Sequence, residues 1–377
     1  MTSLIGRLLA PEDTGVRCVT IEDGRVSGIR EPGEAPPDAL GGPDAWILPG
    51  LVDIQLNGAF GIDFSDPAAD LPRAARALTS TGVTAFLPTI VSSQPEAYPA
   101  VLRALAQPVP AGAARVLGAH LEGPFLSPVR RGAHDPSAIR PPDMGELRAW
   151  LDTGDVAMVT LAPELSGAME LIAELVARGA LAAIGHSDAT WREADAAVAA
   201  GARIGTHLFN AMRPFHHRDP GIVGRLLAAG VATSLIVDGV HVAPETVRLV
   251  ASIKSADELV LVTDGLAALG EPPGPSRLGS REVISDGTVA RLAGGTLSGS
   301  VVPMAPALGR LVAAGLEPAV AVRAASTTPA RLLGRKDELG RVAVGRMADL
   351  VVVDAAWDPL LTMVQGHVAY QRPMAES

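Results

Sequence analysis

Short runs of apolar residues alternate along the chain with segments in which apolar residues recur every three or four positions. The runs are typical of buried strands, and the segments are typical of helices that cover a sheet. Eight runs are predicted as strands: Ala45–Gln55, Val83–Thr89, Arg115–Glu122, Val156–Leu161, Leu181–His186, Ile204–Leu208, Thr233–Val237 and Leu259–Asp264. The predicted helices include Leu71–Ser80, Ala168–Arg178, Trp191–Ala200 and Pro244–Ser255. This alternation predicts an α/β fold, a parallel (β/α)8 barrel of the TIM type.

The two ends of the chain have a different pattern. Strand-like alternation of apolar and polar residues occupies Arg17–Ile29, Gly340–Val353 and Gly366–Tyr370. The first of these stretches contains Asp23-Gly24, a pair typical of a hairpin turn. We therefore predict a small β-sandwich domain built from residues 1–46 and 341–377, with the barrel of residues 47–340 inserted between them.

Composition excludes several classes of protein. Hydrophobic residues make up 48% of the 377 positions and charged residues 19%, so the chain can bury a large core and is not disordered. The formal net charge of −10 argues against nucleic acid as a partner. No run reaches the roughly 18 apolar residues of a spanning helix, and the start lacks a signal-peptide pattern, so we expect no membrane partner. The single cysteine, Cys18, excludes a disulfide within the chain and indicates a cytoplasmic protein.

Polar residues interrupt four predicted strands at their C-terminal ends, the face on which barrel enzymes place their sites. Glu122 and His186 end the third and fifth strands, His207 lies near the end of the sixth, and Asp264 ends the eighth. One carboxylate and two imidazoles make a metal site that leaves a coordination position for water, as in hydrolytic zinc sites. Asp264 beside such a water can accept its proton and pass it to a leaving group. Taken singly, each histidine is more often a capping residue, and Glu122 could also be a cap. The occurrence of all four together indicates the metal site.

The motifs around these residues resemble the amidohydrolase superfamily and, within it, the N-acetylglucosamine-6-phosphate deacetylases. The broader resemblance rests on Ile47–Asp53, the two strand-end histidines and Thr263-Asp264-Gly265. The closer one rests on motifs in family order: Gln55–Gly58, His120–Phe125, Arg131–His134, Gly185–Ser187, His207–Met212, Asp238–His241 and Gly295–Ser300. The resemblance implies metal-dependent hydrolysis of N-acetyl-D-glucosamine 6-phosphate to glucosamine 6-phosphate and acetate, in amino-sugar catabolism.

One departure from the superfamily pattern bears on the number of metal ions. Many amidohydrolases hold two ions, with a His-x-His pair on the first strand and often a carboxylated lysine between the ions. Here the first strand offers Gln55 and Asn57, amides that bind a divalent metal poorly, and the only lysines are Lys254 and Lys336, outside the predicted strands. We therefore expect one divalent ion per chain, held by the glutamate and two histidines named above. Zinc suits these ligands, with iron, cobalt or manganese as alternatives.

The resemblance also implies roles for residues around the metal. Asp264 is expected to be the general base and acid, and His134 to polarise the acetyl carbonyl as an oxyanion donor. The residues expected to contact the substrate are Gln55, Ala133, His134, Asn210, Ala211, Arg218, His241, Leu297, Ser298 and Gly299. Without the resemblance, His134, Asn210 and His241 would be read as a loop histidine, a helix cap and a packing histidine.

A concentrated basic patch is made by Arg213, His216, His217 and Arg218. A phosphate group suits this patch, because arginine offers a planar, bidentate set of donors. The resemblance implies that Arg218 binds the phosphate in the site of the neighbouring subunit, and therefore that the protein is a homodimer. A solvated charged loop is the alternative.

Two other functions stay open. The substrate could be another amino-sugar phosphate, such as the galactosamine epimer, because the sequence does not report the orientation of one hydroxyl group. The protein could also be a catalytically silent sugar-phosphate binding protein on the same scaffold. The presence of Asp264 and all three predicted ligands argues against a silent protein.

Overall fold

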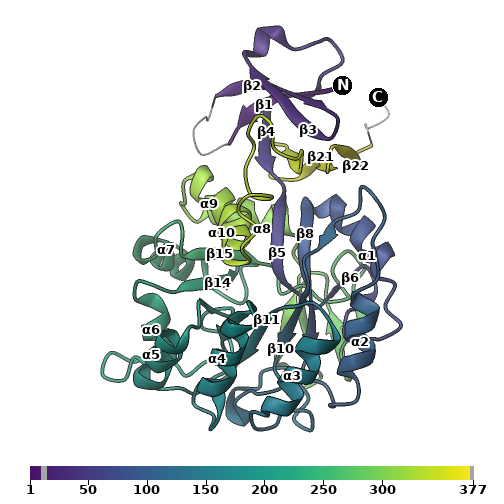
Figure 1. Cartoon of the computed structure of the whole chain (residues 1–377). Coiled ribbons are helices and arrows are strands. Elements are labelled where there is room, and N and C mark those ends of the chain that lie inside the picture. The colour runs from purple at the N-terminus through teal and green to yellow at the C-terminus, as the bar shows by residue number, and fades with distance from the viewer. Residues whose placement is uncertain (10–14, 374–377) are drawn as a thin grey trace.

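The computed structural model describes residues 1–9 and 15–373, and Figure 1 shows a barrel with a smaller sheet at one end of it. Eight parallel strands form the barrel in chain order: β5 (Leu51–Leu56), β8 (Val83–Val91), β10 (Ala119–Glu122), β11 (Val156–Leu161), β12 (Leu181–Ile184), β13 (Ile204–Gly205), β14 (Ala232–Ile236) and β15 (Leu259–Val262). The chain after β15 returns to β5, where Asp264 N donates to Gln55 O at 2.9 Å and Asn57 N donates to Gly265 O at 2.6 Å. The predicted eight-stranded α/β barrel is confirmed.

Helices connect the strands and cover the outside of the barrel. They are α1 (Leu71–Leu78), α2 (Tyr98–Leu105), α3 (Met144–Thr153), α4 (Ala168–Ala177), α5 (Trp191–Ala200), α6 (Gly221–Leu227), α7 (Pro244–Ile253), α8 (Met304–Ala313), α9 (Pro318–Ala325) and α10 (Thr327–Leu332). Local signals set their ends: α5 begins with a capping box between Thr190 and Glu193 and stops at Gly201, whose φ of 119° favours glycine. No helix in the described part of the chain is long and apolar enough to cross a membrane.

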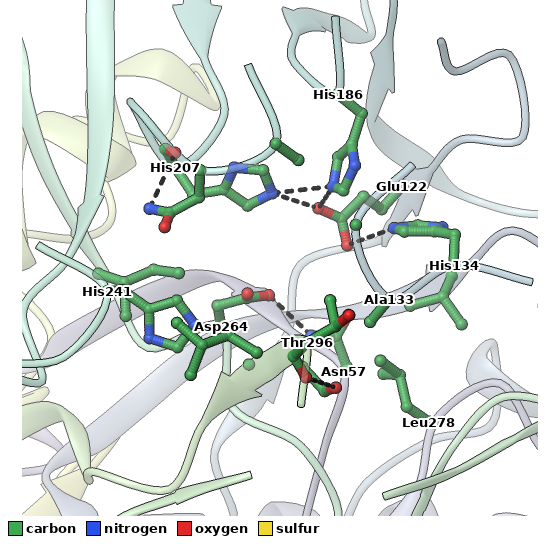
Figure 2. A pocket seen from close by; sticks show the side chains of 18 of the residues that line it. Asn57, Glu122, Ala133, His134, His186, His207, His241, Asp264, Leu278 and Thr296 are labelled. Atoms are coloured by element: carbon green, nitrogen blue, oxygen red, sulfur yellow. Dashed lines mark hydrogen bonds and ion pairs between the residues drawn. The ribbon is translucent and has the colours of Figure 1, made fainter. Parts of the chain in front are cut away.

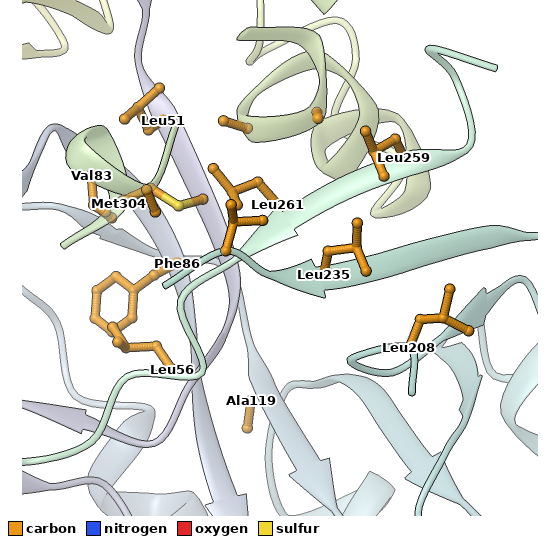
Figure 3. Packing of buried hydrophobic residues seen from close by; sticks show 14 of the residues in the cluster. Leu51, Leu56, Val83, Phe86, Ala119, Leu208, Leu235, Leu259, Leu261 and Met304 are labelled. Carbon is orange, nitrogen blue, oxygen red and sulfur yellow. The ribbon is translucent and has the colours of Figure 1, made fainter. Parts of the chain in front are cut away.

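Side chains along strand β15 alternate between two apolar clusters. On β15, Leu259 and Leu261 pack in the cluster that includes Met304 of α8, as Figure 3 shows. Val260 and Val262 belong to a second cluster, which is made largely by residues of the barrel strands. Strands buried on both faces carry no polar face, and this explains why they read as continuous apolar runs.

The chain ends form one seven-stranded sheet with strand order β22-β21-β20-β4-β1-β2-β3. Its strands are β1 (Thr2–Leu8), β2 (Val16–Glu22), β3 (Arg25–Arg30), β4 (Leu40–Pro49), β20 (Leu350–Val353), β21 (Pro359–Val364) and β22 (His367–Gln371). The two ends of the chain join where β4 pairs with β20, with Leu48 opposite Val351. A separate β domain built from both ends is thus present, as one hydrogen-bonded sheet instead of two. Residues 10–14 and 374–377 of the predicted domain lie outside the described residues.

Several predicted strand limits differ from the structure. The run Ala45–Gln55 covers two strands, because β4 continues to Pro49 and β5 begins at Leu51. The run Arg115–Glu122 likewise divides into β9 (Arg115–Val116) and β10. Near the end of the chain, Gly340 and Gly345 adopt φ values of 79° and 84°, so only the last four residues of the predicted stretch Gly340–Val353 form a strand.

A third sheet, which the sequence pattern did not indicate, lies between β15 and α8. It consists of four antiparallel strands: β16 (Gly274–Leu278), β17 (Arg281–Ser285), β18 (Val289–Arg291) and β19 (Leu297–Ser300). The strands are short and contain glycine, proline and arginine, so they carry little apolar alternation. A two-stranded hairpin, β6 (Gly58–Ala59) with β7 (Ile62–Asp63), follows β5.

Candidate active site

A cavity of about 460 Å³ lies at the C-terminal ends of the barrel strands. Glu122 is the last residue of β10, and His186, His207 and Asp264 follow β12, β13 and β15 by two residues each. All four side chains line this cavity, and Figure 2 shows them facing its centre. The structure therefore brings together the four residues that the sequence placed at separate strand ends.

The backbone turns sharply at three of these residues. His186, His207 and Asp264 have φ values of 47°, 33° and 49°, in the left-handed region that side-chain-bearing residues rarely adopt. Such conformations cost roughly 1 to 3 kcal/mol each, and are typical of functional sites. The turns also explain why β12, β13 and β15 end before the predicted residues.

Glu122, His186 and His207 direct their ligand atoms at one another. The Nε2 atoms of the two histidines lie 3.2 and 2.9 Å from Glu122 Oε1 and 3.0 Å from each other. All three side chains are buried. One oxygen and two nitrogens so close together are the donor set that zinc and related divalent ions take.

The hydrogen bonding of His186 and the pKa values of His186 and Glu122 also fit a cation. Burial lowers the pKa of His207, but its contact with Glu122 outweighs burial and raises that pKa. His186 Nδ1 lies 3.0 Å from the carbonyl oxygen of Arg130, which can only accept, so Nε2 keeps the lone pair that a metal requires. Burial, and then the neighbouring His134, lower the pKa of His186 to about 4. Burial raises the pKa of Glu122, but the contacts of its carboxylate with the surrounding histidines outweigh this effect and hold that pKa well below its usual range. A neutral imidazole and an ionised carboxylate are the states in which these groups bind metals.

The side-chain amides of Gln55, on β5, and of Asn57, which directly follows β5, hold Asp264 in place. Gln55 Nε2 donates to Asp264 Oδ1 at 3.1 Å, and Asn57 Nδ2 donates to the same oxygen at 2.8 Å. Burial, and then the charge of Glu122, raise the pKa of Asp264. A carboxyl group with a raised pKa suits a step in which it first accepts and then releases a proton.

Gln55, a predicted substrate contact, lies beside two carboxylates that line the cavity. Its side chain is fully buried and is absent from the residues that line the cavity. Its Nε2 also donates to Glu122 Oε1 at 2.7 Å, so one amide bridges both carboxylates of the site. Gln55 therefore links these two carboxylates from within β5, whereas Asn57, which directly follows β5, lines the cavity.

Most of the other predicted substrate contacts line the cavity. They are Ala133, His134, Asn210, Ala211, His241, Leu297, Ser298 and Gly299. His241 Nδ1 lies 2.6 Å from Asp238 Oδ2, which fixes the ring. Burial raises the pKa of Asp238, but the hydrogen bond and charge of His241, together with the backbone N–H groups of Val240 and His241, outweigh burial and lower that pKa to about 2. The amide of Asn210 donates to the carbonyl oxygens of His207 and Leu208 at 3.3 Å each, so it also stabilises the turn in which it lies.

Arg218 does not line the cavity of its own chain. Its side chain is exposed, and its Nη1 lies 2.8 Å from His217 Nε2. Arg213 of the same patch forms ion pairs with Asp188 and Asp219. Arg218 forms no ion pair with a carboxylate in the described part of the chain, so its guanidinium can bind an anion from outside.

Ser92 and Arg291 are among the residues around the cavity that were not predicted as site residues. Ser92 directly follows β8 and contacts His134. A search for polar residues at every strand end would have found it. Arg291 lines the cavity from β18, in the sheet that the sequence pattern did not indicate.

Comparison with known proteins identifies the family of this chain. The amidohydrolase family matches residues 46–373. The N-acetylglucosamine-6-phosphate deacetylase of Rattus norvegicus is 43% identical over 344 residues, which cover 86% of this chain and 83% of the rat protein. The N-acetylgalactosamine-6-phosphate deacetylase of Escherichia coli O157:H7 is 36% identical over 357 residues, which cover 93% of each chain.

A solved structure is similar over nearly the whole chain. It is a variant of N-acetyl-D-glucosamine-6-phosphate deacetylase from Mycobacterium smegmatis in complex with N-acetyl-D-glucosamine-6-phosphate. Its TM-score is 0.90 at 38% identity, and the match covers 98% of this chain and 99% of that chain. The similarity therefore includes both the barrel and the sheet made from the chain ends.

Proposed function

The chain belongs to the amidohydrolase family and, within it, to the N-acetylglucosamine-6-phosphate deacetylases, and we propose that it converts N-acetyl-D-glucosamine 6-phosphate to glucosamine 6-phosphate and acetate in amino-sugar catabolism. It is a hydrolase that acts on carbon–nitrogen bonds. The observation that carries the proposal is the meeting of the Glu122, His186 and His207 cluster with Asp264 in one cavity.

The cluster would hold one divalent ion, for which we propose zinc, with iron, cobalt or manganese as alternatives. When bound, the ion supplies a Lewis acid that acidifies water and polarises a carbonyl group. A single ion is supported by Gln55 and Asn57, because their amide nitrogens, which cannot ligate a metal, are the atoms that face the carboxylates.

The protein's own residues would move the proton. Asp264 accepts a proton from water as the water oxygen bonds to the acetyl carbon. The carbonyl oxygen gains negative charge in this step, and His134 Nε2–H donates a hydrogen bond to it. Asp264 then gives the proton to the amide nitrogen as the carbon–nitrogen bond breaks. The water oxygen leaves in acetate, and the nitrogen leaves as the amine of glucosamine 6-phosphate.

The far end of the substrate carries a phosphate group. We propose that Arg218 of one subunit binds it in the cavity of the other, which makes the protein a homodimer. The exposed guanidinium, which forms no carboxylate ion pair in the described residues, supports this role. His241 and Asn210 would contact the sugar or phosphate from within the same chain.

The galactosamine epimer is the second candidate substrate, because of the 36% identity to the Escherichia coli enzyme. Initial rates with both epimers, with and without a chelator, test the proposal. We expect the glucosamine compound to have the higher kcat/KM and the chelator to abolish turnover. A higher kcat/KM for the galactosamine compound would replace the proposed substrate, and binding without turnover would indicate a silent protein.

We predict one tightly bound metal ion per chain. Protein saturated with zinc and then desalted should contain close to one equivalent by elemental analysis, because Gln55 and Asn57 stand where a second site would need histidines. Asn57→His is the matched control variant, since it adds one imidazole to the cavity. Two tight ions in the unmodified protein would contradict the mononuclear site.

We also predict that Arg218→Ala weakens use of the phosphorylated substrate. The loss in kcat/KM should be about 2 kcal/mol, or roughly 30-fold, the value of a hydrogen bond between charged groups. Arg218→Lys should recover only part, because one ammonium cannot replace a bidentate guanidinium. Unphosphorylated N-acetylglucosamine, and an Arg192→Ala control on the exposed face of α5, should change little.

Mixing subunits tests whether Arg218 acts across the dimer. Arg218→Ala and Asp264→Asn chains, unfolded together and refolded, should regain activity above either parent, because the mixed dimer has one complete site. No gain in a confirmed mixed dimer would place Arg218 in the site of its own chain. Equal losses with the phosphorylated and the unphosphorylated sugar would indicate that the loop of Arg218 has a structural role and does not bind phosphate.

A further inference from the structure

Two atoms of Ser92 lie within hydrogen-bonding distance of His134 Nδ1. The Ser92 backbone nitrogen lies 3.2 Å from His134 Nδ1, and the Ser92 hydroxyl oxygen lies 2.8 Å from the same atom. A backbone N–H can only donate, so Nδ1 must be the acceptor. A neutral His134 therefore carries its proton on Nε2.

The other ring nitrogen of His134 faces the catalytic cluster. Nε2 lies 3.7 Å from Glu122 Oε2, which is too long for a strong hydrogen bond. The ring packs edge-on against His186, with centroids 4.5 Å apart and planes at 72°. His134 is 5% exposed and lines the cavity, so its Nε2–H is held near the reacting groups without a strong partner among them.

Ser92 is itself held firmly in place. It directly follows β8 and is 4% exposed. Its hydroxyl oxygen lies against Gly123, where an added Cβ would approach it to 2.3 Å. Gly123 follows the ligand Glu122, so the serine lies between His134 and the backbone of the ligand-bearing strand.

We infer that Ser92 is a positioning residue that keeps His134 in the Nε2–H tautomer and aims this N–H at the substrate's carbonyl oxygen. The inference rests on the proposed amide hydrolysis, and it adds a residue that neither the sequence analysis nor the proposed mechanism contains. In the opposite tautomer the Nε2 lone pair would face the carbonyl oxygen and repel the charge that develops there. Since this contact strengthens as the charge forms, its loss affects kcat more than KM.

Ser92→Ala is the first test, with Ser93→Ala as the matched control. The Ser93 hydroxyl donates to Val91 O at 2.9 Å, so it makes a local bond of the same kind without reaching His134. We expect Ser92→Ala to lower kcat roughly 5- to 10-fold, the effect of one hydrogen bond, with KM within a factor of about two. The backbone N–H remains, so the loss is partial. Unchanged kcat, or a loss equal to that of Ser93→Ala, would overturn the inference.

A double-mutant cycle separates positioning from a general structural effect. If Ser92 acts through His134, adding Ser92→Ala to a His134→Gln enzyme should cost nothing further. Ser92→Thr keeps a hydroxyl, and it should recover kcat toward the wild-type value. Independent, multiplicative losses in the double variant would show that the serine acts elsewhere.

The tautomer can be measured directly in zinc-loaded enzyme labelled with 15N at histidine. Two-bond nitrogen–proton couplings distinguish the two tautomers, and the His134→Gln spectrum identifies the His134 signals. We expect the proton on Nε2. A proton on Nδ1 in an enzyme that hydrolyses the substrate would overturn the inference and leave the function intact. The Nε2–H tautomer in a protein without deacetylase activity would support the assignment and overturn the proposed function.

Discussion

Replacing Asp264 by asparagine is expected to lower kcat by roughly 10²-fold or more, the usual contribution of a general acid–base group. The amide keeps the size of the carboxylate and can still accept hydrogen bonds from Gln55 and Asn57, but it cannot take a proton from water. Steady-state rates on purified enzyme check this result. Metal content, measured on the same sample, should stay near the wild-type value because Asp264 is outside the ligand cluster.

The pH profile provides an independent check on Asp264. Its pKa is raised by burial and by Glu122, so the ionised base forms over a pH range above the ordinary value of about 3.9. Wild-type kcat/KM should therefore rise with pH on the acidic side. This rise should be absent from the residual activity of Asp264→Asn.

The same shift predicts the effect on stability. Between the unfolded and folded pKa values the folded state binds more protons, so Asp264 lowers the free energy of unfolding as pH rises through this range. Asparagine does not ionise, so the free energy of unfolding of Asp264→Asn should not fall in this way. The variant should be no less stable than wild type at neutral pH. Near-normal turnover in a folded Asp264→Asn enzyme would remove Asp264 from the proposed role.

Replacing Glu122 by glutamine is expected to abolish both tight metal binding and turnover. The substitution preserves shape but removes the negative charge that His186 and His207 face. Changing a residue that only orients a metal ligand lowers metal affinity by up to about 100-fold. Loss of a ligand itself should cost more, so we expect metal affinity to fall more than 100-fold. Turnover should fall on the order of 10³-fold, because a Lewis acid supplies several kcal/mol. Metal titration and initial rates measure the two effects.

His120→Gln is the matched control for this experiment. His120 lies two residues before Glu122 and is also fully buried, but its ring nitrogens contact Thr89 and Thr160 instead of the cluster. Glutamine can keep such contacts, so metal content and kcat should stay close to wild type. If His120→Gln loses metal as Glu122→Gln does, the loss reflects strand packing, and Glu122 is not established as a ligand.

The sequence by itself determined the features of this protein that leave a periodic pattern of apolar and polar residues along the chain. Strands buried on both faces leave uninterrupted apolar runs, so the barrel could be predicted from the alternation of runs and helices. A polar residue that ends such a run is conspicuous, and parallel strands bring their C-terminal ends to one face. Glu122, His186, His207 and Asp264 could therefore be assigned to one site without knowledge of any distance.

Only the tertiary structure decided how the groups in the site are held. Gln55 is 67 residues from Glu122 and 209 from Asp264, yet its one amide donates to both carboxylates. Ser92 lies 42 residues from His134 and sets the orientation of its ring. The sheet from β16 to β19, which completes the cavity, has strands too short and too polar to be recognised. Hydrogen bonds between distant residues leave no periodic pattern, because each depends on where two separate backbone segments meet in space.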